Sequence, residues 1–422
     1  MKQSTKAIHT PFQRRDAYDA LKRHKFMGKY NFDEVIERRG SGALKTDKLK
    51  ERYGREDLLA AWVADMDFAT PPFIIEALKN RLEHPIFGYG IEPEDYKSLI
   101  IDWEKDLHDW EIEPEWISYI PGIVKGIGMV LNVFTKPGEN VYIMPPVYHP
   151  FRIVTELNGR NVVNVPLIEE ENGNYSIDFE KLEQSGDNGG VLIFSNPHNP
   201  AGRIWSKEEL KRLAEICKKK NILVISDEIH ADMALWGKKH VPFMTVSEEA
   251  KNNSITFCAP SKVFNIPGIV SSFSVIADKE IREKFYRWLI ANEFNDAPVF
   301  SYVATCAAYR DGKQWREEML SYVEKNITLT EDFFREHLPE IKVLRPDASF
   351  LVWLDCRGLG ISHEELIDAF VNKAKVALND GAMFGKEGEG FMRLNVGMPK
   401  EKLLEVLTRI KEGLTSNKKT GV

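Results

Sequence analysis

Cysteine is scarce in this chain of 422 residues, which holds four cysteines and no CxxC pair. The four are widely separated along the sequence, at positions 217, 258, 306 and 356. This spacing favours a reduced, cytoplasmic protein over a disulfide framework. No metal site is expected, since the segment SHEEL at 362–366 does not complete the HExxH pattern of a zinc enzyme.

Long apolar runs and an excess of basic residues are missing as well. No apolar stretch approaches the roughly 18 residues that cross a membrane, and the N-terminus lacks the apolar core of a secretory signal. The formal net charge is −7, which argues against a surface for nucleic acid or anionic lipid. The sequence therefore predicts neither a nucleic-acid partner nor a membrane partner.

The signatures of three common enzyme classes are absent from the sequence. There is no GxSxG elbow, no Walker loop and no complete GxGxxG, although GYG at 88–90 and KGIG at 125–128 come near one. The hydrolase, nucleotide-binding and dinucleotide-binding interpretations lose support accordingly.

Residues 1–28 differ in composition from the rest, with seven Lys or Arg against two Asp. We expect an N-terminal extension that stays outside the fold. Either it is mobile, or translation starts later, at Met27; a targeting peptide is the third alternative.

Seven short apolar runs alternate with helical stretches between about 117 and 276, a pattern typical of a largely parallel sheet with helices on both faces. The runs are WISYI, NVYIM, NVVNVP, GVLIFS, NILVIS, SITFC and IVSSFSVI. The stretch SKEELKRLAEICKKK predicts a helix with Ser206 as its N-cap and Glu209 completing a capping box. A polar helical region at about 311–338, followed by SFLVWLD and FMRLNVG, predicts a smaller α+β domain.

Polar residues follow directly after several of these strands. The segments are NPHNPAG, DEIHAD and APSKVFN, and PGIVKGIG opens a helix after a fourth strand. Ligands of parallel sheets collect at the carboxyl ends of the strands. We therefore expect one site with these members: Asn199, Asp227, His230, Ser261, Lys262 and the helix N-terminus at Gly122.

This set of residues suits pyridoxal 5′-phosphate. A lysine amine condenses with the aldehyde, and a buried carboxylate keeps the pyridine nitrogen protonated. A helix N-terminus with a nearby hydroxyl binds the phosphate. Lys262 is then the Schiff-base lysine, while the simpler alternative is a turn in which Lys262 points to solvent.

The order of seven motifs along the chain resembles that of the fold-type I pyridoxal-phosphate enzymes in the class I/II aminotransferase superfamily. Within them, the chain resembles the MalY/PatB branch of cystathionine β-lyase-like C–S lyases. The motifs are WVADMDF, FGYG, PPVYHPF, NPHNPAG, SDEIHAD, APSKVFNIPG and MRLNVGMP. The resemblance runs from about Tyr30 to about Leu414. It implies an α/β fold with a large pyridoxal-phosphate-binding domain over 75–310 and a small domain built from 29–74 and 311–415. The large domain would hold a mostly parallel seven-stranded sheet flanked by helices.

The resemblance also implies a role for each site residue. Lys262 would form the Schiff base and move the proton at the substrate Cα, and Asp227 would pair with the pyridinium nitrogen. Asn199 and His230 would lie near the ring oxygen, and Tyr148 would stack on the ring. Asp227, Asn199 and Tyr148 also have plain structural alternatives, as a turn cap, an Asx-turn and a core aromatic.

The phosphate and the substrate carboxylate have their own implied partners. The backbone at Ile123 and Val124, with Ser261, would hold the phosphate. Tyr89 would reach the phosphate of the neighbouring subunit, so a homodimer would be required. Arg393 would grip the α-carboxylate of an amino-acid substrate as a fork. Alternatively, Tyr89 is a surface turn residue and Arg393 pairs with an acidic side chain.

Two positions depart from common patterns. Many aminotransferases of this fold have a tyrosine where this chain has His230, so the protonation of the imidazole near pH 7 becomes an issue. The branch usually has a tryptophan where Thr46 stands, in GALKTDKL, which leaves substrate contacts from that segment open.

Lys262 and Asp227 serve two reactions equally well. With sulfur on Cβ, removal of the Cα proton expels a thiol; without a leaving group, transamination follows. The branch resemblance favours a lyase acting on cystathionine, cystine, cysteine or an S-alkyl cysteine. An aminotransferase is the alternative, and a mainly regulatory, protein-binding role is a third.

Overall fold

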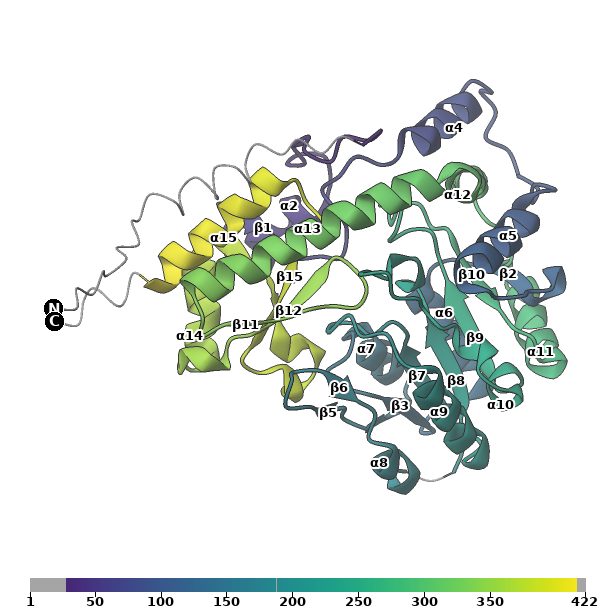
Figure 1. Cartoon of the computed structure of the whole chain (residues 1–422). Coiled ribbons are helices and arrows are strands. Elements are labelled where there is room, and N and C mark those ends of the chain that lie inside the picture. The colour runs from purple at the N-terminus through teal and green to yellow at the C-terminus, as the bar shows by residue number, and fades with distance from the viewer. Residues whose placement is uncertain (1–27, 187, 416–422) are drawn as a thin grey trace, which may run out of the picture.

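The computed structural model describes residues 28–186 and 188–415 (Figure 1). Nearly all of the expected N-terminal extension, residues 1–27, lies outside the described residues. Within the described ranges, every helix is too short or too polar to span a bilayer.

The centre of the larger part of the molecule is a seven-stranded sheet (Figure 1). Its order is β2-β10-β9-β8-β7-β3-β4, and β10 runs antiparallel to both of its neighbours while the other pairs are parallel. Each of the seven predicted runs forms one strand of this sheet, which confirms the expected fold class. The strands are β2 (Ile117–Ile120), β3 (Asn140–Ile143), β4 (Asn161–Asn164), β7 (Val191–Ser195), β8 (Leu223–Asp227), β9 (Ser254–Cys258) and β10 (Ser272–Val275).

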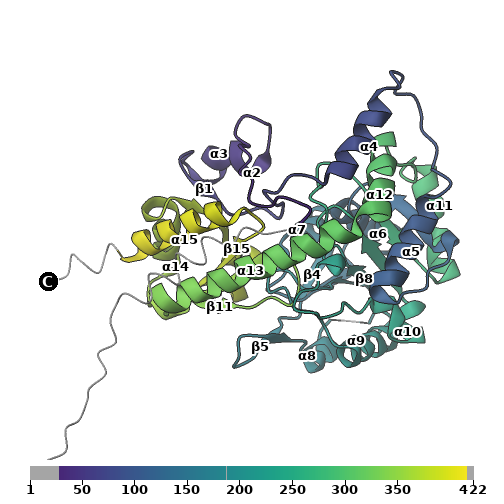
Figure 2. The same ribbon diagram turned by 45° about the horizontal axis from the view of Figure 1, so that its top comes forward.

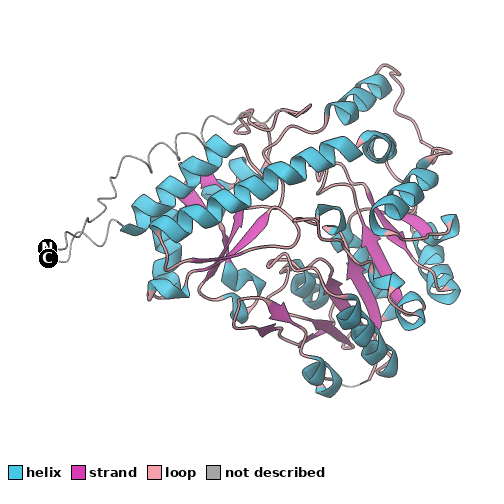
Figure 3. Cartoon of the chain, viewed as in Figure 1, coloured by secondary structure: helices cyan, strands magenta, loops and turns pink. Residues whose placement is uncertain are grey.

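Helices cover both faces of the sheet, as Figure 3 shows. One face packs against α6 (Ile123–Phe134), α7 (Pro150–Leu157) and α11 (Lys279–Ala291). The other packs against α8 (Phe179–Gln184), α9 (Lys207–Lys219) and α10 (Glu248–Lys251). Successive residues of a strand point to opposite faces, so central strands must be apolar at nearly every position. This is why they read as continuous apolar runs.

A four-stranded antiparallel sheet forms the core of the smaller part. Its strands are β11 (Lys342–Leu344), β12 (Leu351–Asp355), β14 (Asn379–Asp380) and β15 (Phe391–Asn395), and α13 (Lys313–His337) and α15 (Lys400–Thr415) pack nearby. The predicted long helix and the strands in SFLVWLD and FMRLNVG are thereby confirmed. Further elements are α4 (Pro72–Leu82), α5 (Tyr96–His108), α12 (Val299–Asp311), α14 (His363–Asp368), β5 (Ile168–Glu169) and β6 (Tyr175–Ser176).

The N-terminal segment lies against the C-terminal elements (Figure 2). Its elements are α2 (Leu44–Asp47), α3 (Leu49–Tyr53) and β1 (Leu59–Ala60), and β1 pairs in parallel with β13 (Val376–Ala377). This pairing agrees with a small domain made of two separate stretches of chain, although the domain boundaries stay a prediction.

Helix α9 begins with the predicted capping box. The Glu209 backbone N–H donates to Ser206 Oγ at 3.2 Å, and the Ser206 backbone N–H donates to Glu209 Oε2 at 2.9 Å. Two N–H groups that the helix cannot satisfy internally are thereby paired.

Ser206→Ala should lower the free energy of unfolding by about 1 kcal/mol, because one of these N–H groups loses its acceptor. Urea denaturation followed by circular dichroism measures the change. Ser98→Ala is the matched control, since the Ser98 hydroxyl donates to the Asp95 carbonyl and caps no N–H group. Equal midpoints for the two variants would contradict the assigned cap.

Candidate active site

A cavity of about 290 Å³ lies at the carboxyl ends of β7, β8 and β9. Eight of the ten predicted site residues line it: Ile123, Val124, Tyr148, Asn199, Asp227, His230, Ser261 and Lys262. Of the other two, Arg393 contacts Asn199, whereas Tyr89 is fully exposed on the loop between α4 and α5. The structure thus brings most of the predicted residues together at one edge of the sheet, and their roles stay a prediction.

Lys262 follows β9 and faces this cavity rather than solvent. Its Nζ donates a hydrogen bond to the Ala64 carbonyl at 2.6 Å. Burial lowers the pKa of Lys262 to about 8, against the pull of Asp65 and Asp227 toward the charged form. A fraction of the side chain is then a neutral amine near pH 7, which is the form that attacks an aldehyde or accepts a proton.

Asp227 ends β8 and is buried at the bottom of the cavity. The Ile229 backbone N–H donates to its Oδ1 at 3.2 Å, and burial raises the pKa of Asp227 to about 7. A buried carboxylate with so few donors is costly to ionise. It suits a cationic group of a ligand, such as a protonated pyridine nitrogen.

His230 is buried, and Tyr148 is half-buried at the edge of the cavity. The Nδ1 atom of His230 has no hydrogen-bond partner among the described residues, and burial lowers its pKa to about 3. The imidazole is therefore neutral at pH 7 and retains one N–H to donate, which answers the question raised by its departure from tyrosine. Burial also raises the pKa of Tyr148, whose ring meets Phe151 edge to face at 5.7 Å.

The N-terminus of α6 opens onto the same cavity. Gly122, with φ of 113°, turns the chain into the helix, and the first N–H groups at Ile123 and Val124 have no acceptor within the helix. Ser261 is buried beside them. Helix N-termini of this kind bind phosphate, so these residues fit the phosphate of the expected cofactor.

Arg393 lies on β15 and is buried, with no carboxylate contact among the described residues. Its Nη1 donates to Asn199 Oδ1 at 2.8 Å and its Nη2 donates to Asn379 Oδ1 at 2.7 Å. Burial lowers the pKa of Arg393 to about 10, so the side chain stays charged at neutral pH. The alternative of a salt bridge with an acidic side chain is wrong, and the buried cation suits an anionic substrate group.

The sequence prediction missed two groups at this site. Asn379 binds Arg393 because the two residues face each other across β14 and β15, a register that the local pattern does not reveal. The Ala64 carbonyl comes from WVADMDF, whose contacts depend on distant segments. Thr46 is half-buried, and its hydroxyl donates to the Arg38 carbonyl at 3.2 Å; it does not line the cavity.

Comparison with known proteins agrees with this geometry. The family model described as aminotransferase class I and II matches residues 63–410. The crystal structure of cystalysin from Treponema denticola, which contains a pyridoxal 5′-phosphate cofactor, superposes with a TM-score of 0.88 at 34% identity, covering 92% of this chain and 99% of that one. Fold and site thus define a member of the fold-type I pyridoxal-phosphate enzymes.

Two curated relatives narrow the assignment. Cystathionine beta-lyase PatB of Bacillus subtilis is 43% identical over 387 residues, covering 91% of this chain and 100% of that protein. Protein MalY of Escherichia coli is 33% identical over 379 residues, covering 89% of this chain and 96% of that protein. The chain belongs to the aminotransferase class I and II family, in the branch that holds PatB and MalY, as its motifs predicted.

Asp227→Asn should raise the thermal unfolding temperature of the cofactor-free protein at pH 8. The pKa of Asp227 is about 7 in the folded state and 3.8 ordinarily, so stability present below pH 4 is lost as the pH rises through 7. The amide of the Asp227→Asn variant does not ionise, so it does not lose stability as the pH rises. The gain should shrink toward pH 4, and affinity for pyridoxal phosphate should fall roughly ten- to hundred-fold. A gain that is independent of pH would contradict the burial argument.

Proposed function

We propose that this chain is a pyridoxal-phosphate-dependent carbon–sulfur β-lyase. Its substrates would be L-cystathionine or related cysteine S-conjugates, cleaved to pyruvate, ammonia and a thiol, which is homocysteine in the case of cystathionine. The observation that carries the proposal is the similarity to cystathionine beta-lyase PatB, which is 43% identical and covers 91% of this chain. The cavity that holds Lys262 and Asp227, with Arg393 joined to it through Asn199, suits the pyridoxal-phosphate chemistry that such a lyase needs. A cystathionine beta-lyase of Corynebacterium glutamicum, 31% identical over 90% of this chain, agrees with this proposal.

Each side chain has a defined part in this reaction. Arg393 binds the substrate α-carboxylate and so orients the Cα–H bond toward Lys262. The neutral Lys262 amine takes the Cα proton. When bound, pyridoxal phosphate supplies an aldehyde and an electron-withdrawing ring, and Asp227 holds the ring nitrogen protonated. Breaking the Cα–H bond forms a Cα=Cβ bond, the thiolate leaves Cβ with its electron pair, and the released 2-aminoacrylate hydrolyses to pyruvate and ammonia.

The direct test is pyruvate release from L-cystathionine by the cofactor-loaded protein with no 2-oxoacid present. Steady release over many turnovers is expected, and Lys262→Ala should lose both the activity and the visible absorbance band of the bound cofactor. Amino transfer that begins only when an oxoacid is added would overturn the lyase proposal and make the protein an aminotransferase.

Arg393→Ala should raise the KM for the substrate roughly ten- to hundred-fold, because a charge-assisted contact contributes roughly 1.5–3 kcal/mol. Arg393→Lys should recover only part of the loss, since an ammonium cannot form the two-pronged contact. Steady-state kinetics on L-cystathionine measures both variants. An unchanged KM in Arg393→Ala would mean that the carboxylate is held elsewhere.

We also propose that the enzyme is a homodimer in which Tyr89 completes the phosphate site of the partner. The loop that carries Tyr89 supports this proposal, because Ile86, Phe87 and Ile91 are exposed beside it. Such an apolar stretch is costly in water and suits a contact between subunits.

Subunit mixing tests the shared site. Lys262→Ala and Tyr89→Ala should each be inactive alone, but refolding them together should restore about a quarter of the wild-type sites, since half of the dimers are hybrids with one intact site each. Activity that stays at the level of the separate variants would show that Tyr89 acts within its own subunit or not at all.

The remaining proposals concern the cellular compartment, the metabolic pathway and the domain boundaries of the enzyme. We place the enzyme in the cytoplasm, in methionine biosynthesis or in sulfur salvage, with domains at 75–310 and at 29–74 with 311–415. The four cysteines, which are free and buried, support a reducing compartment. The pairing of β1 with β13 supports the divided small domain.

A further inference from the structure

The segment Trp62–Phe68 passes beside Lys262 without forming a helix or a strand. Its sequence, WVADMDF, is one of the motifs of the chain, and the proposed reaction gives it no part. The Ala64 carbonyl in its middle accepts the hydrogen bond from Lys262 Nζ at 2.6 Å. The segment is therefore in direct contact with the proposed proton carrier.

The backbone next to Ala64 is strained. Val63 has φ of 49°, in the left-handed region that a β-branched side chain strongly disfavours. Such strain persists only where the surroundings hold it, and it gathers at functional sites.

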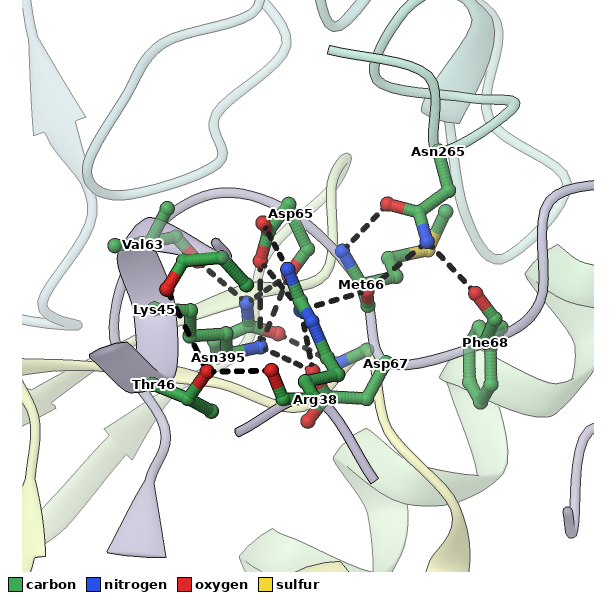
Figure 4. A network of polar contacts seen from close by, with 12 residues as sticks. Arg38, Lys45, Thr46, Val63, Asp65, Met66, Asp67, Phe68, Asn265 and Asn395 are labelled. Carbon is green, nitrogen blue, oxygen red and sulfur yellow. Dashed lines mark hydrogen bonds and ion pairs between the residues drawn. The ribbon is translucent and has the colours of Figure 1, made fainter. Parts of the chain in front are cut away.

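Two side-chain amides hold this segment, the buried Asn395 and the half-buried Asn265, as Figure 4 shows. Asn395 Nδ2 donates to the Val63 and Asp65 carbonyls, both at 2.7 Å, so it binds the carbonyls of the two residues that flank Ala64. Asn265 Nδ2 donates to the Met66 and Phe68 carbonyls at 2.9 and 2.8 Å, and the Met66 backbone N–H donates to Asn265 Oδ1 at 2.9 Å.

The two asparagines are close in sequence to the main site residues. Asn395 lies two residues after Arg393 on the same strand, and Asn265 lies three residues after Lys262. Through these two asparagines, the Trp62–Phe68 segment connects the stretch of sequence that carries Lys262 to the strand that carries Arg393.

A cluster of ion pairs fixes the carboxylates of the same segment (Figure 4). Arg38 contacts Asp65 at 2.7 Å and Asp67 at 2.7 Å, and the buried Lys45 contacts Asp67 at 3.0 Å. Lys402, near the start of α15, contacts Asp67 at 2.6 Å. These cations hold the pKa of Asp67 below its usual range in spite of its burial, so this carboxylate stays charged at neutral pH.

We infer that Asn395 and Asn265 are positioning residues that hold the Ala64 carbonyl as the acceptor for an N–H group of Lys262, and thereby aim the lone pair of the neutral lysine amine at the substrate Cα proton. The inference rests on the proposed role of Lys262 as proton carrier. A four-carbon side chain has many rotamers, and one fixed acceptor restricts them. A hydrogen bond to the ammonium also favours the charged form.

Asn395→Ala tests the inference, with Asn326→Ala as its matched control. Asn326 is 2% exposed and Asn395 is 1% exposed. Asn326 Nδ2 also donates to two backbone carbonyls, those of Val396 and Met398, at 2.9 and 2.8 Å, and neither of these carbonyls belongs to the Trp62–Phe68 segment. The two variants should lose similar stability, and only Asn395→Ala should change the behaviour of Lys262.

The first measurement is exchange of the Cα hydrogen of L-alanine for deuterium in D₂O, followed by NMR with the cofactor-loaded proteins. This exchange needs proton removal but no leaving group. Asn395→Ala should slow it at least about ten-fold at saturating alanine, because a small misplacement of a reacting group is costly. Asn326→Ala should stay within about two-fold of the wild type.

The second measurement is the rate at which free pyridoxal phosphate bonds to Lys262 in the cofactor-free proteins, as a function of pH. Asp65 and Asp227 favour the charged Lys262 and Arg393 disfavours it, and all three remain in both variants. Loss of the fixed acceptor in Asn395→Ala should therefore move the pH midpoint downward, whereas Asn326→Ala should leave it unchanged.

Equal exchange rates and equal midpoints in the two variants would overturn the inference. If Asn395→Ala does not fold, Asn265→Gly replaces it, because glycine adopts the φ of 53° found there; it must then show the same two changes. A wild-type protein that exchanges alanine but releases no pyruvate would reject the lyase and leave this inference standing.

Discussion

Burial of ionisable groups at one edge of a sheet is the constraint on which the rest of the site depends. In water Lys262 would be fully charged near pH 7, and so would Asp227. Enclosure moves the pKa of the lysine down to about 8 and that of the aspartate up to about 7. Neither group could be shifted in this way at an exposed position, because solvent would stabilise the charged form. The fold must therefore keep this edge dry while leaving room for a ligand.

Two sheets, which share hydrophobic clusters, meet that demand. The strands that lead to Asp227 and Lys262 are buried on both faces, so their carboxyl ends emerge from a rigid apolar layer. Arg393 comes from the other sheet and reaches the cavity through Asn199. Because Asn199 follows β7 and Arg393 lies on β15, this hydrogen bond links the two sheets at the point where a substrate would bind. Packing errors beneath either sheet would therefore affect the alignment of Lys262 and Arg393.

Much of this arrangement could be predicted from the sequence, for a physical reason. Strands such as Val191–Ser195 are covered on both faces and read as unbroken apolar runs, and parallel strands bring their carboxyl ends to one edge. The polar residues that follow them, Asp227 and Lys262 among them, could be grouped without any knowledge of contacts. The two-residue strands β1 and β13 could not be predicted, because they carry no periodic pattern and exist only through their pairing. Asn379 and the Ala64 carbonyl were missed for the same reason: their partners are set by tertiary register.

His230 shows the same limit in a single residue. From the sequence, an imidazole in place of a phenol raised the question of a second positive charge beside Lys262. That question is electrostatic, and its answer depends on how deeply the ring is buried and which cations lie near it. Burial, with Lys262 and Arg393 close by, lowers the pKa of His230 to about 3. The ring is therefore a neutral hydrogen-bond donor across the physiological range, the same capacity that a tyrosine hydroxyl would supply. The same burial lowers the pKa of Lys262, raises that of Asp227 and keeps His230 neutral. One feature of the fold therefore sets the protonation states of all three side chains.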